Sequence, residues 1–121
     1  MRYKGTKGKC WEIIRKITYA RSMDCYTCPS KALNRPNAGH FIPVALVGSN
    51  NTLSWDTGQI RTQCVFCNGA GQGMQVEFRR HLVKELGEEK VAEFEKRRWK
   101  VDKVKNWDVL YEELTSLLGE M

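Results

Sequence analysis

The chain has 121 residues, of which 41% are hydrophobic, and this size and composition predict one globular domain. It contains no apolar run long enough to cross a membrane, and its basic N-terminus lacks the apolar stretch of a signal peptide. We therefore expect a cytoplasmic protein with no membrane partner. The net charge is +6, and residues 1–35 hold nine basic residues against two acidic ones. This asymmetry favours a polyanionic partner, although a bias that only improves solubility fits it equally well.

The first segment, residues 1–22, is predicted to be a basic arm followed by a helix. Residues 1–9 are rich in Lys and Gly and are expected to be flexible. From Cys10 to about Ser22, apolar side chains recur at spacings of three and four, which predicts one helical stripe. The members of this stripe are Trp11, Ile13, Ile14, Ile17 and Tyr19.

The second segment, residues 23–86, is predicted to be the functional unit. Residues 24–73 are rich in Cys, Gly, Asn and Pro and show no helical period, so short strands and turns are expected there. One strand is expected next to His40, and its return strand at residues 53–55 or 59–61. The unit ends in a helix predicted from the apolar pattern after Val76, with Gly87 at its C-terminus.

The third segment, residues 87–121, is predicted to be a helical tail. Val91, Phe94 and Trp99 mark one helix, and a stripe from Val104 to Leu118 marks another. This stripe is expected either to fold back on the rest of the chain or to pair with a second copy. Together the three segments predict one compact α+β domain.

Four of the five cysteines form two C-x-x-C pairs, Cys25/Cys28 and Cys64/Cys67, with 35 residues between the pairs. Four thiolates suit a tetrahedral Zn²⁺ ion with no open position, which is a structural site. A thioredoxin-like redox motif would need a βαβ context, and an odd cysteine count argues against a disulfide framework. We therefore expect a structural zinc ion that stabilises the fold. Cys10 is expected to be a thiol on a helix face.

One of the two histidines, His40, lies in the segment between the cysteine pairs, and Asn68 directly follows the last cysteine. A metal at the cysteines would hold Asn68 in place, while the hairpin would present His40. An unperturbed histidine has a pKa of about 6.5, so it can accept a proton at neutral pH. The alternative is a histidine with a purely structural role. The other histidine, His81, is expected on the surface or in packing.

The ordered combination of the two cysteine pairs with Ala38-Gly39-His40 and Gln63-Cys64 resembles the NinG/Rap recombination nucleases of lambdoid phages. These are a zinc-containing branch of the HNH nucleases. The resemblance runs from about Cys25 to Leu118. The stretch from Cys67 to Met74 also resembles the site of phage endonucleases that resolve four-way DNA junctions. This resemblance implies a small zinc-stapled ββα-metal (HNH) unit with flanking helices, in the cytoplasm of a bacterial host.

The resemblance also implies a role for each matching residue. His40 would be the general base that deprotonates the attacking water. Asn37 and Asn68 would hold a catalytic Mg²⁺ or Mn²⁺ ion, which stabilises the charge of the phosphate and the leaving oxygen. The substrates would be branched recombination intermediates such as Holliday junctions, D-loops and flaps. Because two symmetric cuts need two active sites, a homodimer is expected.

Two positions depart from the family pattern. The family usually has Asp where this chain has Asn37, and that carboxylate is a metal ligand. Asn37 keeps an oxygen but loses the charge, so Mg²⁺ should bind more weakly. Natural divergence, compensation by an acid such as Asp56, and loss of catalysis all fit this change, as does a deliberately disabled protein. The family also tends to carry His where this chain has Arg61.

Five basic residues are predicted to contact DNA phosphates. They are Lys31, Arg35, Arg61, Arg79 and Arg80. Phosphate contacts do not depend on base sequence and weaken as salt rises, which suits a protein that recognises DNA shape. For any single arginine, a solvated surface charge is an even alternative. The sequence thus predicts an HNH endonuclease, with a catalytically inactive zinc module that binds branched DNA, or a zinc-stapled protein-interaction domain, as alternatives.

Overall fold

The first element is a long helix, α1 (Gly5–Arg21), in a computed structural model that describes residues 3–121. The isoleucines of its predicted stripe, Ile13, Ile14 and Ile17, are buried, whereas Trp11 and Tyr19 are half-buried. The prediction of a flexible arm is wrong for residues 5–9, which are helical. They are held in place because the Lys7 ammonium lies 2.7 Å from Asn50 Oδ1. The remainder of the predicted arm that precedes residue 3 lies outside the described residues.

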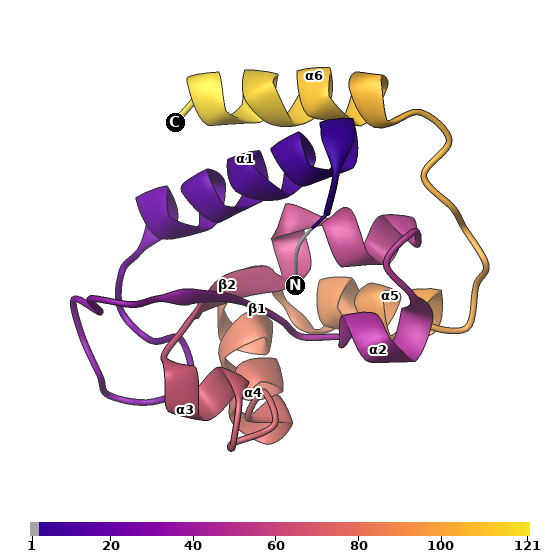
Figure 1. Cartoon of the computed structure of the whole chain (residues 1–121). Coiled ribbons are helices and arrows are strands. Elements are labelled where there is room, and N and C mark those ends of the chain that lie inside the picture. The colour runs from indigo at the N-terminus through magenta and orange to yellow at the C-terminus, as the bar shows by residue number, and fades with distance from the viewer. Residues whose placement is uncertain (1–2) are drawn as a thin grey trace.

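The last helix, α6 (Trp107–Gly119), packs along α1, as Figure 1 shows at the top of the view. The side chain of Asn106 begins it by accepting hydrogen bonds from the N–H groups of Asp108 (3.0 Å) and Val109 (3.1 Å). The two helices share a core with two residues from the middle of the chain. This core comprises Cys10, Ile13, Ile14, Ile17, Trp55, Ile60 and Leu114. The tail therefore folds back within the chain, onto α1.

A two-stranded antiparallel sheet lies beneath α1, formed by β1 (Asn37–His40) and β2 (Ile60–Gln63). Asn37 pairs with Gln63, and His40 pairs with Ile60. The return strand is thus the later of the two expected positions. The earlier position is a 3-10 turn, η1 (Thr52–Trp55), because the Asn51 side chain accepts the N–H of Leu53 (2.9 Å) and closes a turn there.

Short helices surround the sheet. Between the strands lie α2 (Val44–Val47) and a second 3-10 turn, η2 (Thr57–Gln59), and β2 leads directly into α3 (Val65–Asn68). Two longer helices follow, α4 (Gln75–Leu86) and α5 (Glu88–Arg97). They pack on a second core, which comprises Phe41, Ile42, Leu53, Phe78, Leu82, Val91 and Phe94.

The boundary between α4 and α5 was predicted correctly at Gly87. This residue has φ +91°, in the left-handed region that glycine adopts without steric cost, so it ends one helix and starts the next. In contrast, α5 ends at Arg97, which leaves Trp99 in a loop rather than on the predicted helix. The fold is of the α+β class. Among residues 3–121, we find no helix with the length and apolar character needed to span a membrane.

Candidate functional site

The four paired cysteines come together in the structure. Their Sγ atoms all lie within 4.8 Å of one another. Cys28 Sγ lies 3.8 Å from Cys64 Sγ. Ligands about 2.3 Å from a tetrahedral zinc ion are separated by about 3.8 Å, so the cluster has the dimensions of a structural zinc site. The predicted ligands are therefore brought close enough together to hold one structural metal ion such as zinc.

Backbone amides face the sulfur atoms of this cluster. Cys25 Sγ accepts the N–H of Cys64 (3.3 Å), and Cys64 Sγ accepts the N–H of Cys67 (3.4 Å). Burial raises the pKa of the Cys25 thiol, but the backbone N–H groups of Cys64 and Thr27, with the side chains of Thr27 and Cys28, outweigh it and lower the pKa to about 6. Burial raises the pKa of Cys67 to about 12. A bound cation would stabilise all four sulfurs as thiolates at neutral pH. Four thiolates are a donor set that suits zinc.

The cluster is connected to the hairpin by Gln63. Its Nε2 donates to Thr27 Oγ1 (3.0 Å), beside the first cysteine pair, and to the carbonyl of Gly73 (2.9 Å). The Gln63 side chain crosses Gly39, where a Cβ atom would lie 1.9 Å from Gln63 Oε1. Only glycine fits there, which explains physically why Gly39 and Gln63 occur together in the sequence pattern.

His40 is oriented by a single hydrogen bond. Its Nε2 lies 2.8 Å from the carbonyl oxygen of Ser54, which can only accept, so Nε2 carries the proton and Nδ1 is the free acceptor. The ring stacks on Trp11 of α1 at a centroid distance of 5.6 Å. Burial lowers the pKa of His40, and the Ser54 carbonyl opposes this shift. At neutral pH the imidazole is therefore neutral and able to accept a proton.

The three residues predicted to form the catalytic site line one pocket. Asn37, His40 and Asn68 surround a cavity of about 330 Å³. Asn37 and His40 come from the two ends of β1, whereas Asn68 is the last residue of α3. Among the described residues that line this cavity, none is a carboxylate. Asp56, named as a compensating acid, instead binds Arg97 and caps η2 through Gly58.

Polar residues of α1 that line the pocket were also missed from the sequence. Arg15 and Tyr19 extend into it from α1. Arg15 Nε donates to the Tyr19 hydroxyl (3.4 Å), which donates to the carbonyl of Pro36 (3.0 Å). With Trp11 they lie four residues apart, and this spacing places all three on one helix face. That spacing was a signal in the sequence, but it gave no indication that the face lies over β1.

The five predicted phosphate contacts divide into two groups. Lys31, Arg35 and Arg80 are exposed and form no ion pair with another described residue. Arg61 is only 8% exposed, and its guanidinium binds the Glu85 carboxylate with an N–O distance of 3.0 Å. Arg79 is held by Glu88 and Glu95. In this structure both arginines therefore join elements of the fold, and the phosphate-binding role predicted for them is not supported by their surroundings.

Arg35 and Arg61 offer a matched test of this division. Arg61→Ala is expected to lower the free energy of unfolding by roughly 1–3 kcal/mol, since it removes several hydrogen bonds of a buried cation beside a partly exposed carboxylate. Arg35→Ala is expected to leave stability unchanged and to weaken DNA binding, with a smaller salt dependence. Thermal unfolding and binding titrations at two salt concentrations measure both. Equal stability of the two variants would contradict the structural role of Arg61.

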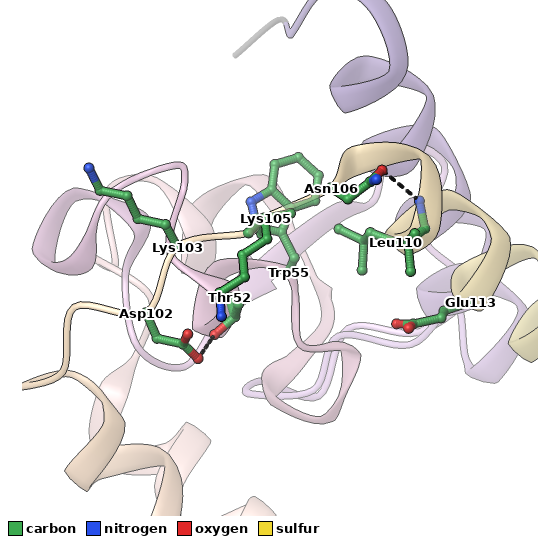
Figure 2. A pocket seen from close by; sticks show the side chains of 10 residues that line it. Thr52, Trp55, Asp102, Lys103, Lys105, Asn106, Leu110 and Glu113 are labelled. Carbon is green, nitrogen blue, oxygen red and sulfur yellow. Dashed lines mark hydrogen bonds between the residues drawn. The ribbon is translucent and has the colours of Figure 1, made fainter.

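A second cavity, of about 380 Å³, lies beside the start of α6 (Figure 2). The two hydrogen bonds drawn there run from Thr52 Oγ1 to Asp102 (2.8 Å) and from the N–H of Val109 to Asn106 Oδ1 (3.1 Å). Both bonds fasten the loop that precedes α6. This cavity contains none of the residues predicted to be catalytic, so it is separate from the candidate site.

Fold and site together define the class of protein: a small α+β domain in which a four-cysteine site, suited to a structural metal such as zinc, ties distant segments together. The model of the family described as bacteriophage lambda NinG protein matches residues 4–119, and the chain therefore belongs to the NinG family of lambdoid phage proteins. The predicted resemblance to this family is confirmed.

Curated relatives agree with this assignment. The chain is 29% identical over 97 residues to protein ninG of Escherichia phage 933W, which covers 77% of this chain and 47% of that protein. It is 29% identical over 89 residues to protein ninG of Escherichia phage lambda, covering 70% of this chain and 42% of that protein. The chain thus spans less than half the length of these relatives. No solved structure matches it significantly.

Proposed function

We propose that this chain is a metal-dependent DNA endonuclease of the HNH type. One observation carries the proposal: His40, with Nδ1 as its free acceptor, lines the same pocket as Asn37 and Asn68. The hairpin of β1 and β2 followed by α3 agrees with a ββα-metal unit. The enzyme would hydrolyse phosphodiester bonds, with His40 as its general base.

His40 is suited to this role for two reasons. The hydrogen bond from Nε2 to the Ser54 carbonyl and the stacking on Trp11 fix the ring, so Nδ1 is positioned without rotational freedom. The lowered pKa keeps the imidazole unprotonated at neutral pH. His40 Nδ1 would take the proton of the attacking water as the new P–O bond forms, and the 3′-oxygen would leave.

The pocket fits a weakly held divalent cation. Asn37 and Asn68 would supply neutral amide oxygens to it, and the remaining ligands would be water and the DNA phosphate, which brings the negative charge. A bound Mg²⁺ or Mn²⁺ stabilises the charge on the phosphate and on the leaving oxygen. Arg15 would bind a second phosphate oxygen, since its guanidinium is exposed and its contacts are with the neutral Tyr19.

Branched recombination intermediates are the proposed substrates, namely Holliday junctions, D-loops and flaps. Support comes from the resemblance to recombination nucleases and from the basic residues Lys31, Arg35 and Arg80, which suit backbone contacts. A symmetric junction is resolved by two cuts, so we propose that the chain acts as a homodimer. Sedimentation of the protein with and without junction DNA tests this assembly.

A catalytically inactive zinc module that binds branched DNA is the second candidate. The absence of a carboxylate among the described residues of the His40 pocket favours it, because Mg²⁺ sites usually contain one or two carboxylates. Both candidates bind DNA, and only the first cuts it.

Restoring the carboxylate separates the two candidates. Asn37→Asp is expected to raise the cleavage rate, because a charged oxygen holds the cation where charge develops on the leaving group. The parent chain is expected to be slow with Mg²⁺ and faster with Mn²⁺. Nicking of labelled four-way junctions, flaps and linear duplexes by both proteins measures this. Binding without nicking by either protein, in either metal, would establish the inactive module instead.

A further inference from the structure

The loop between α5 and α6 presents an apolar surface to solvent. Trp99 is 78% exposed and Val101 is 89% exposed, and both line a shallow cavity of about 370 Å³ with Leu46 of α2, which is 59% exposed. We call these three residues the Trp99 patch. Exposed apolar groups that gather on a soluble domain commonly mark a binding site, because folding otherwise removes them from water.

This loop is fixed rather than free. It is hydrogen-bonded to the segment that begins η1, and Asn51 pairs with Lys103 in an isolated β-bridge. The bonds run from Thr52 N–H to the Asp102 carbonyl (2.8 Å), from Val104 N–H to the Asn50 carbonyl (2.8 Å), and from Asn51 Nδ2 to the Lys100 carbonyl (3.0 Å). The indole of Trp99 is thus carried by an ordered backbone, so binding a ligand costs little conformational entropy in this loop.

Three basic residues line the cavity of the patch, namely Arg98, Lys100 and Lys103. Residues 96–105 contain six Lys or Arg residues and one acidic residue, Asp102. Arg97 is paired with Asp56, whereas the other five basic residues form no ion pair with a described residue. In Figure 2 the Lys103 side chain extends away from the cavity beside α6. The tail has a net negative charge as a whole, but six of its seven basic residues lie within residues 96–105.

Arg98 and Trp99 form a cation–π pair. The guanidinium of Arg98 lies 4.8 Å from the centroid of the Trp99 ring. An exposed aromatic ring next to cations is the arrangement by which proteins bind single-stranded nucleic acid, with bases stacked on the ring and phosphates near the cations. The anionic strand would also match the charge of the surrounding lysines.

We propose that the Trp99 patch binds an unpaired nucleotide of the DNA, by stacking its base on the indole. Helix α2 connects this patch to the catalytic pocket, because Val44 lines the His40 pocket while Leu46 and Val47 line the Trp99 cavity. A strand that leaves a branch point can therefore reach both places. The inference rests on the proposed function only in taking DNA as the ligand, and it does not require cleavage.

Fluorescence anisotropy with two labelled DNAs tests the proposal, in buffer without added Mg²⁺ or Mn²⁺. One DNA is a fork with unpaired thymidine arms, and the other is a fully paired duplex of the same length. Trp99→Ala is expected to weaken fork binding by roughly five- to a hundredfold and duplex binding by less than about twofold. Trp99→Phe retains a stacking ring and is expected to keep most of the affinity.

Lys100→Ala and Lys84→Ala provide a matched pair for the charge. Both lysines are exposed, but Lys84 lies on α4 away from the patch. Only the variant at Lys100 is expected to weaken fork binding. Unfolding temperatures of all variants check that the fold is intact, which is expected because Trp99 contributes little to either core.

Three results would overturn the proposal. The first is unchanged fork binding by Trp99→Ala, and the second is an equal loss of affinity for fork and duplex. The third is a Trp99→Ala variant that binds the fork normally but loses binding to vesicles with anionic lipids or to an acidic peptide. The cleavage assay tests the endonuclease proposal separately from the Trp99 patch. If the parent and Asn37→Asp never nick DNA but the Trp99→Ala effect is present, the endonuclease is refuted and the patch remains. If nicking occurs without a Trp99→Ala effect, the patch is refuted and the endonuclease proposal remains.

Discussion

His40→Ala is expected to reduce DNA cleavage by about 10²- to 10⁴-fold, in the parent chain and in the Asn37→Asp variant. The substitution removes Nδ1, the only acceptor that the ring offers once Nε2 is bound to the Ser54 carbonyl. DNA binding is expected to change little, because the imidazole is neutral and contributes no charge to a phosphate contact. Single-turnover nicking of a four-way junction, with binding measured in parallel, gives both quantities.

A structural role of His40 must be distinguished from a catalytic one. The ring stacks on Trp11, so the alanine variant also loses packing and is expected to be less stable. Added imidazole separates the two roles, since a free base in the vacated space restores proton transfer without restoring the fold. Rescue of cleavage by imidazole supports the general base. If the folded alanine variant cuts as fast as its parent, the HNH assignment is wrong.

Removal of zinc is expected to unfold the region of residues 24–73. Structural Zn²⁺ contributes about 10–16 kcal/mol to small zinc-binding folds, which matches or exceeds the total stability of a typical domain. The unfolding should spread into the core shared by α1 and α6, because Trp55 and Ile60 belong to it. Metal analysis of fresh reduced protein should find one zinc ion per chain, and circular dichroism during chelation should show the loss of structure.

Cys10 provides the matched control for the metal site. It is fully buried, like Cys67 of the cysteine cluster, but lies on α1, and its thiol donates a hydrogen bond to the Trp107 carbonyl (3.5 Å). Cys64→Ser is expected to abolish stoichiometric zinc binding, whereas Cys10→Ser should keep one zinc ion with only a modest loss of stability. Absence of zinc from the fresh parent protein, or full zinc retention by Cys64→Ser, would refute the zinc site.

The sequence by itself determined the four-cysteine cluster and part of the fold. Two C-x-x-C pairs have few structural uses, so the spacing alone was enough to group Cys25, Cys28, Cys64 and Cys67 correctly. The end of α4 at Gly87 was equally accessible, because a glycine after an apolar helical pattern is a local signal. These predictions succeeded because short-range spacing is the direct cause of the structure.

The surroundings of the charged residues were decided by the tertiary structure alone. Arg61 follows the return strand's first residue and appeared suited to DNA, yet its ion-pair partner Glu85 is 24 residues away on α4. Arg15 was not among the predicted site residues, but α1 places it in the pocket with His40. Sequence spacing identifies neighbours within one helix or strand. It contains no information about which side chain of a distant element a given residue will contact, because that depends on how the elements pack.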